Sequence, residues 1–185
     1  QGRKQNSEKL KQIQYKLSGV NRFSSIGRGN LGSQLSKVCN ILSKGVNIPV
    51  LKVAIGSFDT HSEQFWRHRD LLRELDESLS ETVKALRDIG IWNDTMIMTY
   101  SEFGRRAAEN GSRGTDHGMA APHFLMGGKL KGGFVGQLPN LGRLRNNNLE
   151  FEIDYRTVYE MVLREHFGLD ENPFQKYQNK DLFSV

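Results

Sequence analysis

Side chains that commonly bind zinc and similar divalent ions occur in three short motifs of this chain. Asp59 and His61 flank a threonine in the first motif, Glu102 stands in the second, and Asp116 and His117 are adjacent in the third. Carboxylates and imidazoles together form the usual ligand set for such ions. The predicted ligands are Asp59, His61, Glu102 and His117. Asp116 is expected to orient His117 from behind, with direct ligation as the alternative.

Each motif alone is a weak indication of metal binding. An Asp-Thr-His sequence can also cap a turn or a helix, because both Asp and Thr favour those positions. Three motifs at matching positions in the predicted fold make the metal interpretation the stronger one. Arg105 and Arg106 come shortly after Glu102 in the second motif. They are candidates for binding an anionic ester oxygen, with a structural salt bridge as the equally weighted alternative.

The motifs lie beside segments that have the composition of buried strands. Val50–Ile55 is a nearly continuous apolar run, and Thr95–Tyr100 is a second strand candidate. Pro122–Met126 is a third. Between the first two, Glu63–Ile89 has apolar residues at spacings of three and four, which predicts a long amphipathic helix. A strand, helix and strand in this order is the crossover unit of a parallel sheet, in which ligands lie beyond the carboxyl ends of the strands.

Further helices are expected on both sides of this unit. A short helix is predicted over Glu8–Leu17, and another from about Gly32 to Ser43, ended by Gly45. The last helix is predicted over Asp154–Phe167, with Asp154 as its N-cap. The predicted fold class is therefore α/β, with a largely parallel sheet flanked by helices.

Composition narrows the classes of protein that fit. The chain has 185 residues, of which 37% are hydrophobic and 25% charged, values typical of a globular domain. No apolar run is long enough to span a membrane. Cys39 is the single cysteine, which excludes an intrachain disulfide, and its apolar neighbours predict a buried thiol. The net charge of +5 fits an anionic substrate. Nucleic-acid binding is suggested by the basic N-terminal segment but disfavoured, because aromatic residues are not interleaved with the basic ones there.

The three motifs, in this order, resemble a bacterial family known as domain of unknown function 1501. The resemblance covers roughly Val50 to Gly168. It rests on five sequences: FDTHSEQ at 58–64, YSEFGR at 100–105, GTDHG at 114–118, KGG at 131–133 and DYR at 154–156.

This family is grouped with the alkaline phosphatase and sulfatase superfamily, which implies a doubly wound sheet, two divalent metals and hydrolysis of phosphate or sulfate esters. By resemblance, Asp59 and His61 hold the first metal, and His117 completes that site. Glu102 stands where the superfamily has the Asp of an Asp-His pair that binds the second metal. The next residue here is Phe103, which cannot coordinate an ion. The cofactor implied is one or two divalent ions, zinc by preference, and the substrate is a small anionic ester.

The superfamily also places a metal-binding Asp and a Ser or Thr nucleophile in the first half of its fold. Neither can be identified before Val50. We therefore expect residues 1–49 to be the middle of a longer domain and residues 50–185 to be its C-terminal half. This incomplete, alkaline-phosphatase-like domain is expected to leave a sheet edge open, through which it could form an oligomer. An export signal upstream would place the protein in the periplasm or outside the cell; otherwise it is cytoplasmic.

Three functions compete at this point. The leading hypothesis is a metal-dependent hydrolase of phosphate or sulfate esters, inactive as this fragment alone. The alternative is a non-catalytic domain that binds a metal or ligand but has lost part of the site, which Glu102-Phe103 supports. A nucleic-acid-binding module is the third and weakest hypothesis.

Overall fold

The computed structural model describes Lys11, Ser18, Gly19 and residues 21–169, so the expected helix over Glu8–Leu17 lies almost entirely outside the described residues. The chain divides into two compact units. The first comprises residues 1–59 and 66–91, and the second comprises residues 60–65 and 92–185.

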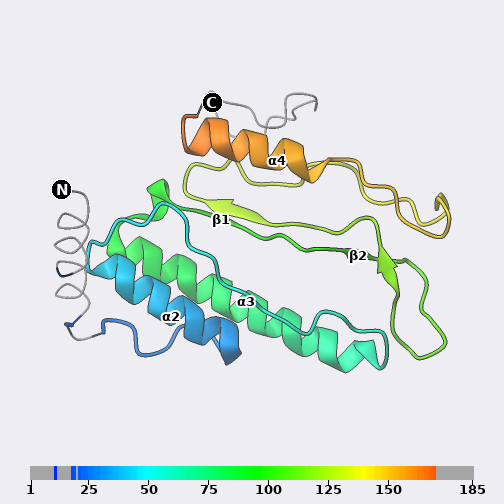
Figure 1. Cartoon of the computed structure of the whole chain (residues 1–185), viewed down its shortest axis with the longest axis horizontal. Coiled ribbons are helices and arrows are strands. Elements are labelled where there is room, and N and C mark those ends of the chain that lie inside the picture. Colours follow the sequence, from blue (N-terminus) through cyan, green and yellow to red (C-terminus); the bar gives the residue numbers. More distant parts are fainter. Residues whose placement is uncertain (1–10, 12–17, 20, 170–185) are drawn as a thin grey trace. The chain divides into compact units, whose positions relative to one another are not determined.

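Two helices form the described core of the first unit. Helix α2 spans Gly29–Ser43, and α3 spans Gln64–Ile89, with its first two residues in the second unit. The two helices run side by side (Figure 1). Both predicted helices are thus confirmed. Their shared core consists of Ile26, Leu31, Leu35, Cys39 and Ala85.

Carboxylates of α3 cap the N-terminus of α2. Arg28 is the N-cap residue of α2, and its side chain makes no capping hydrogen bond. Instead, the backbone N–H of Leu31 donates to Glu74 over 2.9 Å, and the N–H of Gly27 donates to Glu81. The first N–H groups of a helix lack partners within the helix and carry partial positive charge, so carboxylates stabilise them. These bonds join the two helices at a point where the local sequence supplies no cap.

The predicted strand over Val50–Ile55 is wrong. This segment has no regular secondary structure and pairs with no strand among the described residues, and Val50 is 71% exposed. Val53 and Ile55 still pack against the helical core. The side chain of Gln34 takes over part of the role of a neighbouring strand, because it accepts from the Ala54 N–H over 3.0 Å and donates to the Ala54 carbonyl over 2.7 Å. The apolar composition of Val50–Ile55 therefore correctly indicated that some of its side chains are partly buried, but it did not indicate whether the segment pairs with another strand.

The second unit contains two small antiparallel sheets, where a parallel sheet was predicted. Strand β1 (Met96–Met98) pairs antiparallel with β4 (Leu125–Gly127), and β2 (Gly104–Arg105) pairs antiparallel with β3 (His117–Gly118). Each sheet has two strands. The predicted α/β class is thus wrong for the described residues. The prediction of a parallel sheet required a strand on each side of α3 in the sequence. Only the segment after α3 forms a strand, β1, and its partner β4 is antiparallel.

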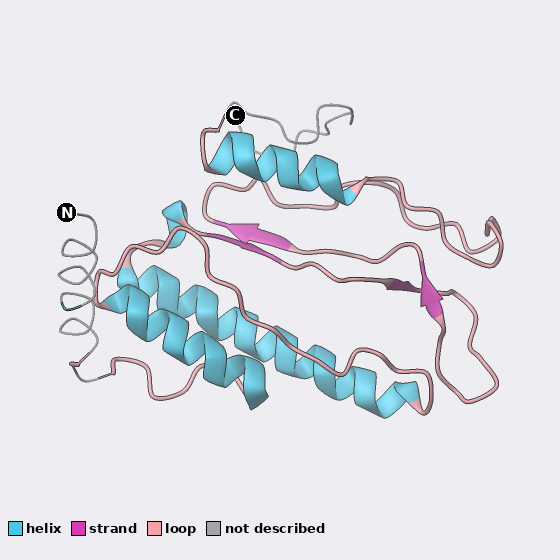
Figure 2. Cartoon of the chain, in the orientation of Figure 1, coloured by secondary structure: helices cyan, strands magenta, loops and turns pink. Residues whose placement is uncertain are grey.

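Loops and short helices make up the rest of the second unit up to residue 169 (Figure 2). The 3-10 helix η1 spans Trp92–Asp94, and α4 spans Tyr155–Met161. Asp154 is the N-cap of α4 and accepts from the Arg156 N–H, as predicted. The helix continues as a π-helical turn, η2, over Val162–His166. Among the residues that the structure describes, every helix is too short or too polar to cross a bilayer.

Candidate metal centre

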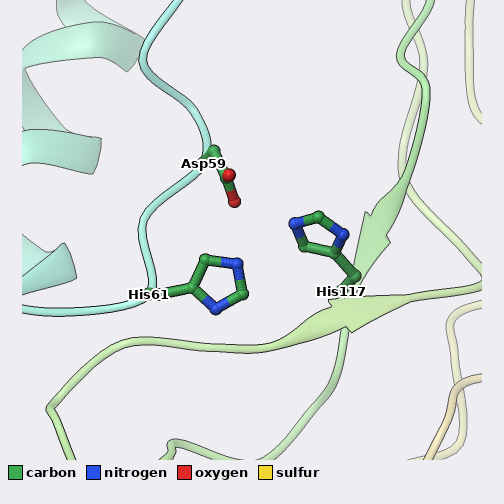
Figure 3. Close-up of side chains that lie close together, drawn as sticks. All are labelled: Asp59, His61 and His117. Carbon is green, nitrogen blue, oxygen red and sulfur yellow. The ribbon is translucent and has the colours of Figure 1, made fainter.

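Three of the four predicted metal ligands come together in the structure. Asp59, His61 and His117 each offer one ligand atom, and these atoms all lie within 4.8 Å of one another. Their side chains point toward a common space, and all three residues are exposed (Figure 3). Zinc bonds of about 2.0–2.1 Å in a tetrahedral site place ligand atoms about 3.4 Å apart. Side-chain rotations that move the ligand atoms by about an ångström would therefore bring them to the spacing of such a site.

Glu102 does not belong to this group. It is exposed, and within the described part of the chain the Asp59, His61 and His117 cluster is the one group of three or more such side chains that could hold an ion. The structure thus does not bring Glu102 to the predicted ligand cluster.

The loop that carries His61 is attached to the loop that precedes His117. The Thr115 N–H donates to the Thr60 carbonyl over 3.2 Å, and two further backbone bonds join Glu63 to Ser112 and Gln64 to Arg113. Thr60 is only 2% exposed, although its neighbours are at the surface. These bonds fix the main chain on both sides of His61.

Gly114 is required for this close approach. A Cβ atom at this position would lie 2.2 Å from the His61 carbonyl carbon and 2.6 Å from the Ser62 nitrogen. Atoms of the main chain cannot yield as a flexible side chain can, so only glycine fits here. The geometry of the His61 loop therefore depends on a residue in the other loop.

Backbone strain accompanies the contact between these loops. Glu63 has a φ of 46° and Arg113 a φ of 60°, both in the left-handed region that non-glycine residues seldom adopt. The Arg113 guanidinium forms an ion pair with the Glu63 carboxylate. Such strain costs about 1–3 kcal/mol per residue and persists where surrounding contacts fix the conformation, often at functional sites.

Asp116 lies beside His61, whereas the sequence pointed to His117 as its partner. The Asp116 Oδ1 is 3.4 Å from the His61 Nδ1 and 3.2 Å from the Asn110 Nδ2. The hydrogen bond from Asn110, followed by that from His61, holds the pKa of Asp116 below its ordinary value, and the charge of Arg106 contributes further. The Asp116 carboxylate is thus kept ionised close to one of the two imidazoles.

His117 is held by a different contact. Its ring stacks on Phe103 with centroids 3.7 Å apart and planes inclined by 10°. His117 lies opposite Arg105 in the β2–β3 pair, and the Arg105 Cζ is 5.0 Å from the Phe103 centroid. Stacking and cation–π contacts restrict the orientation of the imidazole. Phe103, which cannot coordinate a metal, therefore packs on the predicted ligand His117.

Of the two arginines proposed for substrate binding, Arg105 uses its side chain in a bond to the protein, and Arg106 bonds through its main chain. The Arg105 guanidinium donates to the Thr115 carbonyl, and the Arg106 main-chain N–H donates to the Asp116 carbonyl over 3.0 Å. A role for either side chain in binding substrate stays a prediction.

Sequence reasoning missed three residues that shape the site: Asn110, Gly114 and Phe103. A signal existed for the first two, since Asn110-Gly111-Ser112-Arg113-Gly114 has the composition of a tight turn directly before Asp116 and His117. The stack of Phe103 on His117 depends on strand register, which the short segments did not reveal.

The comparisons with known proteins give one match. A family model described as "Protein of unknown function (DUF1501)" matches residues 41–180, which include every residue of the candidate centre. The comparisons with curated proteins and with solved structures give no match.

Proposed function

Because the chain belongs to the DUF1501 family, a family of unknown function, we propose its function from the site: a divalent metal centre in a hydrolase of phosphate or sulfate esters. The ligands proposed are Asp59, His61 and His117. The observation that carries the proposal is the approach of their three ligand atoms to within 4.8 Å of one another.

The chemistry of these residues fits zinc or a similar ion. Two imidazoles and one carboxylate are a ligand set found in catalytic zinc sites, in which a fourth position stays open for water or substrate. All three residues are exposed, so a small molecule can reach the ion. When bound, the ion would polarise an ester oxygen and lower the pKa of a water molecule or nucleophile.

The surrounding residues contribute by holding the ligands. Asp116 lies next to His61, and Phe103 stacks on His117, so each imidazole has a partner outside the ligand cluster. Ligands held in advance lose less conformational freedom on binding, which increases metal affinity. Arg105 is the last residue of β2 and Arg106 follows it, and these two basic side chains are our candidates for attracting an anionic ester.

A non-catalytic metal-binding domain is the second candidate function. It is favoured by one observation: Phe103 stands beside Glu102, and Glu102 is outside the ligand cluster. A single ion with three protein ligands would then bind a ligand without turnover or stabilise the fold.

Metal binding and ester turnover, measured together, test both candidates. Purified metal-free protein is titrated with zinc and with manganese, and hydrolysis of 4-nitrophenyl phosphate and 4-nitrophenyl sulfate is followed. His61→Ala and His117→Ala should each weaken zinc binding by about 100-fold or more, because loss of even a residue that only orients a ligand costs about 10–100-fold. The matched control His166→Ala, on η2, should leave zinc binding unchanged. Turnover lost with the metal supports the hydrolase, and binding without turnover supports the second candidate. Zinc affinity unaffected by both ligand variants would refute the metal centre.

A further inference from the structure

Asn110 uses its whole side chain to connect three parts of the site. Its Nδ2 group donates to the His61 carbonyl over 3.0 Å and to the Asp116 Oδ1 over 3.2 Å. Its Oδ1 accepts from the backbone N–H of Ser112 over 2.9 Å and of Gly114 over 3.1 Å. The amide thus has partners on both its donor and its acceptor side.

The two sides of this amide have separate effects. The acceptor oxygen closes the turn from residue 110 to residue 114, as Asn side chains do when they bond to main-chain groups two residues later. The donor group reaches out of the turn, to the main chain of His61 and to the carboxylate that faces the ring of His61. A change of the donor alone can therefore alter the site while the turn is kept.

Asp116 presents the same oxygen to Asn110 and to His61. Because a carboxylate only accepts hydrogen bonds, a neutral imidazole that bonds to it must carry its proton on the nitrogen that faces it, which for His61 is Nδ1. Its Nε2 is then unprotonated and carries the lone pair that can bind a metal. One ring nitrogen of His61 faces Asp59 and His117, and the other is turned away from them (Figure 3). The nitrogen 3.4 Å from Asp116 is Nδ1.

We propose that Asn110 and Asp116 are positioning residues that select the Nδ1–H tautomer of His61, so that Nε2 is the metal ligand. This inference rests on the proposed metal centre and deepens it, because it names the ligand atom and the residues that choose it. Histidine ligands that donate their second N–H to a carboxylate are held in one tautomer and one ring orientation, and loss of such a partner costs about 10–100-fold in metal affinity.

The tautomer can be read without any metal. A two-bond 1H–15N correlation spectrum of the metal-free protein at about pH 8, where an ordinary histidine is neutral, distinguishes Nδ1–H from Nε2–H. His61→Ala assigns the signals. We expect His61 as Nδ1–H in the natural protein and a shift toward Nε2–H in Asp116→Ala.

Asn110→Asp removes the donor group and adds a negative charge, while it keeps an acceptor oxygen for the turn. The new carboxylate keeps an oxygen for the N–H groups of Ser112 and Gly114 but loses both donors and repels Asp116. Asn140→Asp is the matched control, because Asn140 closes a similar turn with Gly142 over 2.9 Å and lies outside the site. We expect zinc affinity to fall about tenfold in Asn110→Asp and to stay unchanged in the control.

The outcomes separate this inference from the metal proposal. His61 found as Nε2–H in the natural protein would overturn the inference, even if zinc binds with high affinity. An unchanged tautomer and affinity in Asp116→Ala would also overturn it. Failure of zinc to bind at all would refute the metal centre, while the tautomer would still report on Asn110 and Asp116.

Discussion

Replacement of Gly114 by alanine should disrupt the candidate centre without touching any ligand. The new Cβ would lie 2.2 Å from the His61 carbonyl carbon, and ordinary contacts begin at 3.4 Å. The two loops must therefore separate by about 1.2 Å. The bonds from Thr115 to the Thr60 carbonyl, at 3.2 Å, and from Asn110 to the His61 carbonyl, at 3.0 Å, would both exceed hydrogen-bonding distance.

The magnitude follows from these losses. Two hydrogen bonds contribute about 1–3 kcal/mol to stability. A misplacement of about 1 Å at a site that needs aligned groups can cost about 100-fold. We therefore expect Gly114→Ala to weaken zinc binding about 10–100-fold and to lower the free energy of unfolding by about 1–3 kcal/mol.

Zinc competition with a chromogenic chelator and denaturant unfolding provide the two measurements. Gly111→Ala is the matched control, because Gly111 lies in the same loop and a Cβ there meets nothing within 4 Å. It should behave like the natural protein. Zinc affinity within twofold of the natural value in Gly114→Ala would show that the two loops do not determine the site.

Three further predictions concern single side chains. Phe103→Leu should weaken zinc binding about 2–10-fold by removing the stack on His117, and Phe103→Tyr should restore it; equal affinities in all three proteins would contradict this. Asp154→Ala should cost about 1 kcal/mol of unfolding free energy at neutral pH, as loss of an N-cap does. Hydrogen bonding from Arg156 lowers the Asp154 pKa below its ordinary value of 3.8. The stabilisation by Asp154 should therefore be full above pH 3.8 and be lost as the pH falls through the lowered pKa. A stability difference between Asp154→Ala and the natural protein that persists in strong acid would refute this prediction. Burial raises the pKa of Cys39 to about 11, so a thiol reagent at neutral pH should modify it only in denaturant, and rapid labelling of the native protein would be inconsistent with this burial.

Helices were predictable from the sequence because their signals are local. The stripe in Glu63–Ile89 predicted α3 to within one residue, and Asp154 was correctly identified as a cap. The pairing of strands was not predictable in the same way. Val50–Ile55 has the composition of a buried strand, but whether such a run finds a neighbour depends on distant residues. Here a glutamine side chain from α2 bonds to its main chain at Ala54.

In the candidate site, too, the local features were predictable from the sequence and the tertiary contacts were not. Residue types and their order identified Asp59, His61 and His117 as the group to examine, although their metal-binding role stays a prediction. Which carboxylate faces which imidazole depends on the path of the loops between them, and the sequence did not indicate that Asp116 lies beside His61. The close approach at Gly114 likewise follows from tertiary structure.

X-ray absorption at the zinc edge of the zinc-loaded protein tests the central claim most directly, because it reports the atoms bonded to the ion. The proposed centre predicts one zinc per chain, with nitrogen and oxygen neighbours at about 2.0–2.2 Å and the outer-shell scattering of two imidazoles. In His117→Ala the spectrum should retain the scattering of one imidazole or show no bound zinc. A spectrum without imidazole scattering, or one unchanged in His61→Ala and His117→Ala, would contradict the assignment of Asp59, His61 and His117 as the metal ligands.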